Sequence, residues 1–186
     1  ASDVYKRQAL KEWAYDFVIG PMADLSKNVD YDLMYRDFYV LVVPKRYDLE
    51  TYAEYGEQGS FPVIDMKKLP PMDYIFQDET TFVRKGINRI LEKQKLSIAP
   101  RLVVTSSTLA LQAAENGFGC CIVSTGHLAY LNQSANLKVY LIKGEETSSC
   151  GVAYLHNKIF SEEEKCCIAL ILSLIHISEP TRLQLI

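Results

Sequence analysis

Residues 38–44, Phe-Tyr-Val-Leu-Val-Val-Pro, form a nearly continuous apolar run that ends at a proline. β-Branched and aromatic residues make up most of it. Such runs are typical of strands that are covered on both faces, as in a parallel or mixed α/β sheet. The run therefore predicts a buried strand at the centre of an α/β sheet.

Further apolar runs and helical patterns alternate along the rest of the chain. Residues 31–36 are expected to form a link or a short strand, and residues 9–13 the end of a helix. In the helix expected at 82–95, Arg84 lies opposite the apolar stripe. This alternation predicts an α/β fold with a largely parallel sheet. Strands are expected at 15–20, 74–76, 101–104, 118–123, 137–142 and 151–155, and helices at 82–95, 108–116 and 161–172.

The composition of the 186 residues is that of an ordinary globular protein. Hydrophobic residues make up 48% and charged residues 23% of the chain, which excludes a disordered chain, a collagen-like fibre and a coiled coil. No apolar run approaches the ~18 residues that a membrane helix needs, so no membrane partner is expected. The formal net charge of −3 speaks against direct binding of nucleic acid, because domains that bind it are normally basic.

The five cysteines include no C-x-x-C pair, and Cys120 and Cys121 lie in a run expected to be a buried strand. His127 could in principle join them in a metal or Cys-His site, but burial in a strand already explains both thiols, so no metal is expected. Free cysteines are typical of a reducing cytosol, and the N-terminus lacks the apolar segment of a signal peptide. A cytoplasmic location is therefore expected.

Motifs of catalysis and cofactor binding are absent from the sequence. It contains neither a P-loop nor a dinucleotide-binding glycine pattern, and no H-E-x-x-H. Ser107 does not lie in a G-x-S-x-G turn. We therefore expect no cofactor and no enzymatic activity.

Polar residues follow three of the expected strands, where a turn or a helix begins. In open α/β sheets, ligands bind beyond the carboxyl ends of the strands, where helix N-termini offer unpaired N–H groups. The alternative is that these residues only cap their helices, as Ser and Thr often do. Three such loops in one chain favour a site for a small polar or anionic molecule, with Thr80 and Ser107 as direct contacts. The candidate contacts are Gly20, Pro21, Asp78, Glu79, Thr80, Thr81, Ser106, Ser107, Thr108 and Ser124.

The two ends of the chain differ in character from the segments they flank. Residues 1–8 and 173–186 are similar to peptides that arise when sequencing-adapter DNA is translated. We expect both to be artefacts and the natural protein to extend further at both ends.

Three segments, in their order and spacing, resemble the effector-binding domain of LysR-type transcriptional regulators. The family pattern L-x-x-G-x-x-D-hydrophobic-A-I is similar to residues 10–19, with Trp13 in place of the glycine. The pattern L-x-L-V-x-P-x-x-H-P-L is similar to residues 38–49. The pattern V-x-x-G-x-G-I-x-x-L-P is similar to residues 114–124, with Ser124 in place of the proline.

The resemblance covers residues 9–172 and implies a two-lobed α/β fold like that of periplasmic binding proteins (type 2), with an incomplete first lobe. Residues 9–62 and 149–172 are expected in the first lobe and residues 63–148 in the second. The implied function is that of the effector-sensing domain of a cytoplasmic transcriptional regulator, whose effector lies between the lobes. The implied partners are further copies of the chain, and DNA only through a helix-turn-helix domain that this chain lacks.

Two other functions are compatible with the same fold. One is an extracytoplasmic solute-binding protein, against which the free cysteines and the missing export signal speak. The other is an enzyme, which would need a catalytic group that the sequence does not show.

Overall fold

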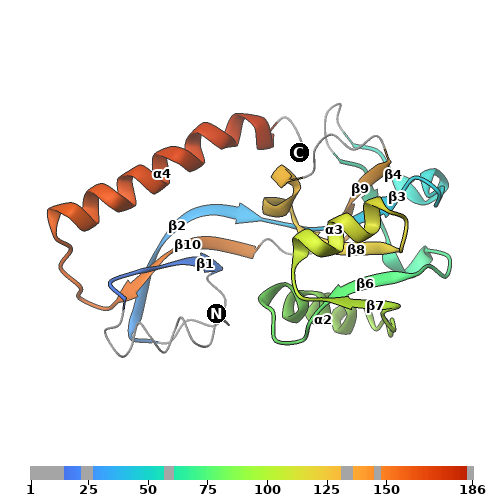
Figure 1. Cartoon of the computed structure of the whole chain (residues 1–186), viewed down its shortest axis with the longest axis horizontal. Coiled ribbons are helices and arrows are strands. Elements are labelled where there is room, and N and C mark those ends of the chain that lie inside the picture. The colour runs from blue at the N-terminus through green and yellow to red at the C-terminus, as the bar shows by residue number, and fades with distance from the viewer. Residues whose placement is uncertain (1–14, 22–26, 57–60, 131–135, 145–147, 184–186) are drawn as a thin grey trace. The chain divides into compact units, whose positions relative to one another are not determined.

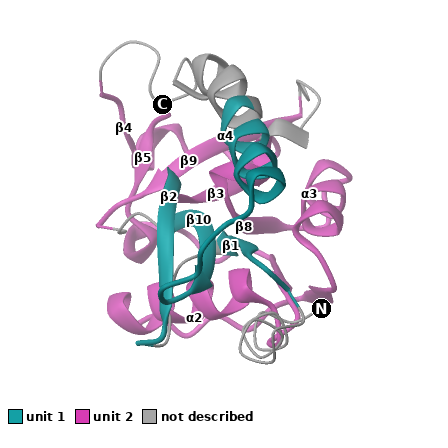
Figure 2. Ribbon diagram, turned by 90° about the vertical axis from the view of Figure 1, so that its left-hand side faces the viewer, with its two compact units in different colours: residues 1–37, 148–186 teal, residues 38–147 magenta. Residues whose placement is uncertain are grey.

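The computed structural model of the chain describes residues 15–21, 27–56, 61–130, 136–144 and 148–183 (Figure 1). The chain forms two compact units (Figure 2). Unit 1 consists of residues 1–37 and 148–186, and unit 2 of residues 38–147. Among the helices that the structure describes, none has the length and apolar character that a membrane span requires.

Unit 1 contains a three-stranded antiparallel sheet, in which β10 (Ser148–Leu155) lies between β1 (Val18–Pro21) and β2 (Val29–Asp37). Along the chain, β2 falls where the sequence predicts a link or a short strand. It is a nine-residue strand because it pairs with the whole of β10, with one irregularity in register between Cys150 and Gly151.

The long helix α4 (Glu162–Leu183) completes unit 1. The predicted capping box at its start is confirmed: the N–H of Ser161 donates to Glu164 Oε2 at 2.7 Å, and the N–H of Glu164 donates to Ser161 Oγ at 3.2 Å. Lys158 Nζ lies 2.9 Å from carboxylate oxygens of both Asp16 and Glu164. These ion pairs tie the segment before β1 to the first turn of α4. The helix continues beyond residue 172, where the sequence predicts its end.

Unit 2 is built on a seven-stranded sheet with the strand order β4-β5-β9-β3-β8-β6-β7. At its centre, all six residues of β3 (Tyr39–Pro44) are buried, which confirms the prediction for the opening sequence run. The strands are β4 (Ala53–Glu54), β5 (Val63–Ile64), β6 (Tyr74–Gln77), β7 (Leu102–Val104), β8 (Cys120–Ser124) and β9 (Leu137–Ile142).

The sheet of unit 2 is mixed, so the prediction of a largely parallel sheet is wrong. The β6–β7, β6–β8 and β5–β9 pairs are parallel, whereas β3 runs antiparallel to both β8 and β9. Helical crossovers lead from β6 to β7 and from β7 to β8 and make those strands parallel. The chain enters the unit through β3, and no such crossover fixes the direction of that strand.

One helix covers each face of this sheet. On one face, α2 (Phe82–Gln94) contributes Ile87 and Ile90 to an apolar cluster with Leu41 and Phe76. On the other face, α3 (Ser107–Glu115) contributes Ala110, Leu111 and Ala114 to a cluster with Val40, Val42 and Ile75. Neighbouring residues of β3 thus supply both clusters.

The unit boundary differs from the sequence-based division of the chain. Residues 9–62 are expected in the first lobe, but unit 2 already begins at Phe38. The reason is the pairing of β3, which is hydrogen-bonded to β8 and β9 along its length.

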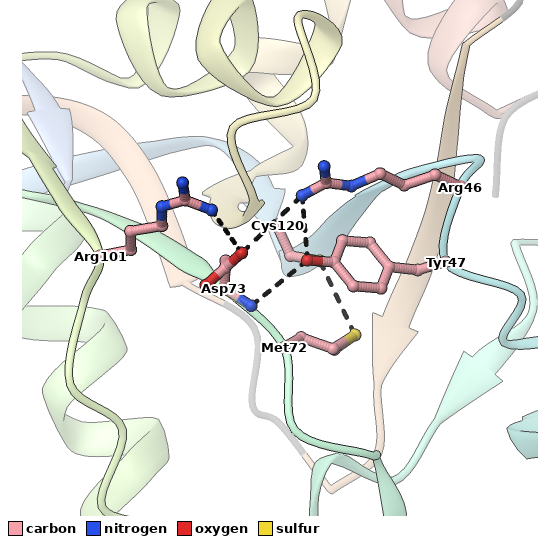
Figure 3. A network of polar contacts seen from close by, with 6 residues as sticks. All are labelled: Arg46, Tyr47, Met72, Asp73, Arg101 and Cys120. Carbon is pink, nitrogen blue, oxygen red and sulfur yellow. Dashed lines mark hydrogen bonds and ion pairs between the residues drawn. The ribbon is translucent and has the colours of Figure 1, made fainter.

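A polar network lies where the parallel strands of unit 2 begin (Figure 3). Asp73, just before β6, accepts a hydrogen bond of 2.6 Å from Arg101 Nη1 and lies 3.9 Å from Arg46 Nη2. Its carbonyl oxygen accepts the N–H of Cys120 at 2.8 Å, close to Gly119, where a Cβ atom would come within 2.7 Å of that oxygen. The network therefore joins the starts of β6, β7 and β8, and it requires a residue without a side chain at position 119.

Candidate functional site

The opposite edge of the same sheet holds the loops in which the sequence predicts ligand contacts. Because β6, β7 and β8 are mutually parallel, their carboxyl ends lie at one edge. The loop after β6 leads into α2, the loop after β7 leads into α3, and the end of β8 leads into the short helix η3 (Thr125–Tyr130). Eight of the ten predicted contacts belong to these three loops of unit 2.

Gln77, the last residue of β6, connects two of the loops. Its side chain is almost fully buried, and its Nε2 donates to Ser107 Oγ and to the carbonyl oxygen of Ile122, both at 3.3 Å. Its backbone carbonyl accepts a hydrogen bond of 3.2 Å from Arg84 Nη1. Among the described residues no donor reaches Gln77 Oε1. A buried acceptor without a donor costs roughly 1–3 kcal/mol, so a water molecule or a ligand donor that reached this oxygen would be favourable.

The loop after β6 is folded around the side chain of Asp78. Its Oδ1 accepts the N–H of Thr80 at 3.0 Å and the hydroxyl of Thr80 at 2.7 Å. These hydrogen bonds lower the pKa of the Asp78 carboxyl group. Thr81 caps α2, because its Oγ1 accepts the N–H of Arg84 at 3.2 Å. The sequence places a free hydroxyl and a free N–H at Thr80, but both already donate to Asp78, and the cap belongs to its neighbour.

In the loop after β7, as in the loop after β6, one residue caps the helix and a neighbouring residue carries a hydroxyl with a different hydrogen-bond partner. Ser106 caps α3, because its Oγ accepts the N–H of Leu109 at 3.2 Å. Ser107 is the first residue of the helix, is only 6% exposed and accepts the hydrogen bond from Gln77. Thr108 is exposed. A hydroxyl can donate while it accepts, so the Ser107 proton remains available to a ligand.

At the end of β8, Ser124 is buried and its Oγ lies 3.0 Å from His127 Nδ1. Thr125 fastens this end of the strand to the residue before β3, since its N–H donates to the carbonyl oxygen of Phe38 at 2.8 Å. The metal or Cys-His alternative for His127 finds no support in this geometry. Cys120 begins β8, whereas His127 follows its end. Burial raises the pKa of the Cys120 thiol to about 12, which leaves it a poor nucleophile and metal ligand.

Arg84 belongs to this edge of the sheet, although the sequence pattern places it on the polar side of its helix. It is only 9% exposed, and its guanidinium group lies over the ring of Phe76, 4.9 Å from the ring centroid. Its Nε donates to Asn88 Oδ1 at 2.8 Å. Its position in the first turn of α2 is the only sequence signal that could have placed it beside the loop after β6.

The remaining two predicted contacts lie in unit 1. Gly20 and Pro21 are in β1, where they pair with Gly151 and Cys150 of β10. Their assignment to the site stays a prediction.

The geometry can be compared with known proteins. Residues 6–174 match the family model described as the LysR substrate binding domain. No curated protein matches the chain in sequence.

Solved structures share the fold at low sequence identity. The regulatory domain of CcmR from Synechocystis PCC6803, in complex with 2-PG, superposes with a TM-score of 0.76 at 15% identity, over 92% of this chain and 78% of that one. The effector binding domain of QuiR, in complex with shikimate, gives a TM-score of 0.68 at 18% identity, over 89% and 74% of the two chains. HinK, a LysR family transcriptional regulator from Pseudomonas aeruginosa, gives 0.70 at 12% identity, over 94% and 57%.

Proposed function

Because the chain belongs to the family of LysR substrate-binding domains, we propose that it senses a small polar effector at the carboxyl ends of β6, β7 and β8. The structural neighbours are effector-binding domains with the periplasmic-binding-protein-like type 2 fold, and the prediction of that fold class from the sequence is confirmed. Likeness to regulators favours sensing over the alternative of an extracytoplasmic solute-binding protein.

The observation that carries the proposal is the hydrogen bond between Gln77 and Ser107. It brings the end of β6 and the start of α3 together at an edge where the first turns of two helices also lie. Unpaired N–H groups of such helix starts, together with the hydroxyls of Ser107 and Thr108, are suited to the oxygen atoms of a small polar molecule. Asp78, Glu79, Thr80, Thr81, Ser106 and Ser124 shape the surrounding loops and are proposed as further contacts, with Glu79 and Ser106 contributing backbone atoms only.

The remaining parts of the proposal follow from the family. Its members act in regulation, so we propose that the chain releases its effector unchanged and uses no cofactor. Homo-oligomers, a cytoplasmic location and control of DNA through a separate helix-turn-helix domain are proposed on the same ground. Gly20 and Pro21 are proposed as further contacts.

A screen of small polar compounds by thermal unfolding tests this function. A ligand that binds only the folded protein raises its free energy of unfolding, by about 2.7 kcal/mol at a hundredfold excess over Kd. We expect at least one compound to give a saturable rise in Tm and to be recovered chemically unchanged after incubation. A broad metabolite set in which no compound raises Tm, or stoichiometric conversion of the bound compound, would contradict the proposal.

A further inference from the structure

We propose that Arg84 recognises an acidic group on the effector. In the absence of the effector, Glu79 pairs with the guanidinium group of Arg84, and the effector displaces Glu79 when it binds. The inference rests on the proposed function, because it names the chemical class that the site binds. It starts from the environment of Arg84, which is a cation at the edge where β6 ends and is almost fully buried.

The hydrogen bonds of Arg84 leave its charge without a closely bound anion. Nε and Nη1 donate to neutral oxygens, those of the Asn88 side chain and the Gln77 backbone. In the described part of the chain, Glu79 is the one carboxylate that pairs with Arg84, and its Oε1 lies 3.6 Å from Nη2. That separation is longer than a charge-assisted hydrogen bond of about 2.7–2.9 Å. A buried charge is stable when it is both paired and hydrogen-bonded, and Arg84 meets this condition only in part.

Breaking the ion pair between Glu79 and Arg84 costs little free energy, because Glu79 is exposed to solvent. Its side chain is 81% exposed, whereas that of Arg84 is 10% exposed. The solvent around the Glu79 carboxylate screens its attraction to Arg84. The neighbouring carboxylate of Asp78 attracts Arg84 electrostatically, but its Oδ1 accepts the N–H and the hydroxyl of Thr80, and these two described residues, Asp78 and Arg84, form no ion pair.

An acidic ligand could make the close, charge-assisted hydrogen bonds to Arg84 that Glu79 does not make. A carboxylate, sulfate or phosphate group is planar or compact and can accept two N–H groups of a guanidinium at once. Gln77 bonds Arg84 through its backbone and Ser107 through its side chain, so both residues lie at the carboxyl end of β6, although α2 and α3 cover opposite faces of the sheet. A ligand that spans the end of β6 could bring an acidic group to Arg84 and a polar group to Ser107.

Sulfate is the probe for the first experiment. We titrate it at constant ionic strength and follow the side-chain Nε–Hε signal of Arg84 by NMR, identified by its absence in Arg84→Gln. We expect a saturable shift, and an apparent Kd about fivefold lower in Glu79→Gln, a difference of about 1 kcal/mol. Glu92→Gln removes the same charge from an exposed position on α2 and is expected to leave the Kd unchanged.

Three outcomes would overturn the inference. The first is a shift that does not saturate, and the second is a Kd that is the same in the parent and in Glu79→Gln. The third concerns the rise in Tm that sulfate causes. If Glu79→Gln increases this rise as much in the Arg84→Gln background as in the parent, the increase comes from net charge alone and not from Arg84. The first two comparisons need Arg84→Gln only to identify the Nε–Hε signal, and triple-resonance assignment of the parent protein identifies it if that variant fails to fold.

The effector screen separates this inference from the proposed function. A neutral stabilising compound that needs Ser107 but binds Arg84→Gln as tightly as the parent would keep the function and refute the role of Arg84. A screen without any stabilising compound would contradict the function whatever the sulfate titration shows.

Discussion

Gly86→Ala is expected to destabilise the protein by about 1–3 kcal/mol, the usual cost of forcing extra volume into a packed core. A Cβ atom at this position of α2 would lie 1.9 Å from Oη and 2.2 Å from Cζ of Tyr39, whose side chain is buried at the start of β3. In an open helix interior the same change stabilises by about 1 kcal/mol. The sign of the effect therefore reports whether the ring of Tyr39 lies against α2, and urea unfolding measures it.

The matched control for this variant is Gly20→Ala, in β1. No atom lies within 4 Å of a Cβ there, so only a small change in unfolding free energy is expected. In a Tyr39→Val background, Gly86→Ala should become neutral or stabilising. If Gly86→Ala stabilises the parent protein, then α2 does not pack on β3 as described.

Ser107→Ala is expected to weaken effector binding by about ten- to a hundredfold. The loss of a hydrogen bond to a charged group costs roughly 1.5–3 kcal/mol, and the change also removes an acceptor that orients the Gln77 side chain. Calorimetric titration with a compound from the screen measures the effect. Ser107 tests the site better than Thr80, because both donors of Thr80 already bind Asp78.

Ser106→Ala is the matched control on the neighbouring residue. Ser106 caps α3, so its loss should lower the free energy of unfolding by about 0.5–2 kcal/mol and leave the affinity unchanged. Equal affinity in the parent and in Ser107→Ala, with a lower Tm in the latter, would mean that Ser107 has a structural role alone.

Much of the fold could be predicted because local patterns determine it. The buried run at 38–44 is β3, the amphipathic pattern at 82–95 is α2, and the capping box at Ser161 begins α4. Strand direction could not be predicted, because pairing between β3 and its neighbours is a long-range property. For the same reason β2 is longer than predicted, since β10, its partner, lies more than a hundred residues away in the sequence.

The sequence predicts the candidate site at the level of loops but not of atoms. Helix starts and hydroxyl-rich turns point to the loops after β6, β7 and β8. Which residue of each turn caps its helix depends on a shift of one position. Thr81 and Ser106 are the caps, whereas Thr80 bonds Asp78 and Ser107 bonds Gln77. Gln77 and Arg84 carry no motif. Their importance comes from burial and from partners on other elements.

Backbone amide NMR with a stabilising compound tests the central claim most directly. The account predicts that the largest chemical-shift changes fall on residues 77–81, 105–108 and 124–127, at the carboxyl ends of the parallel strands. The sheet has a second polar edge, where Arg46, Asp73 and Arg101 form the network in Figure 3. Saturable shifts confined to that edge, with none in the three loops, would contradict the assignment of the effector site.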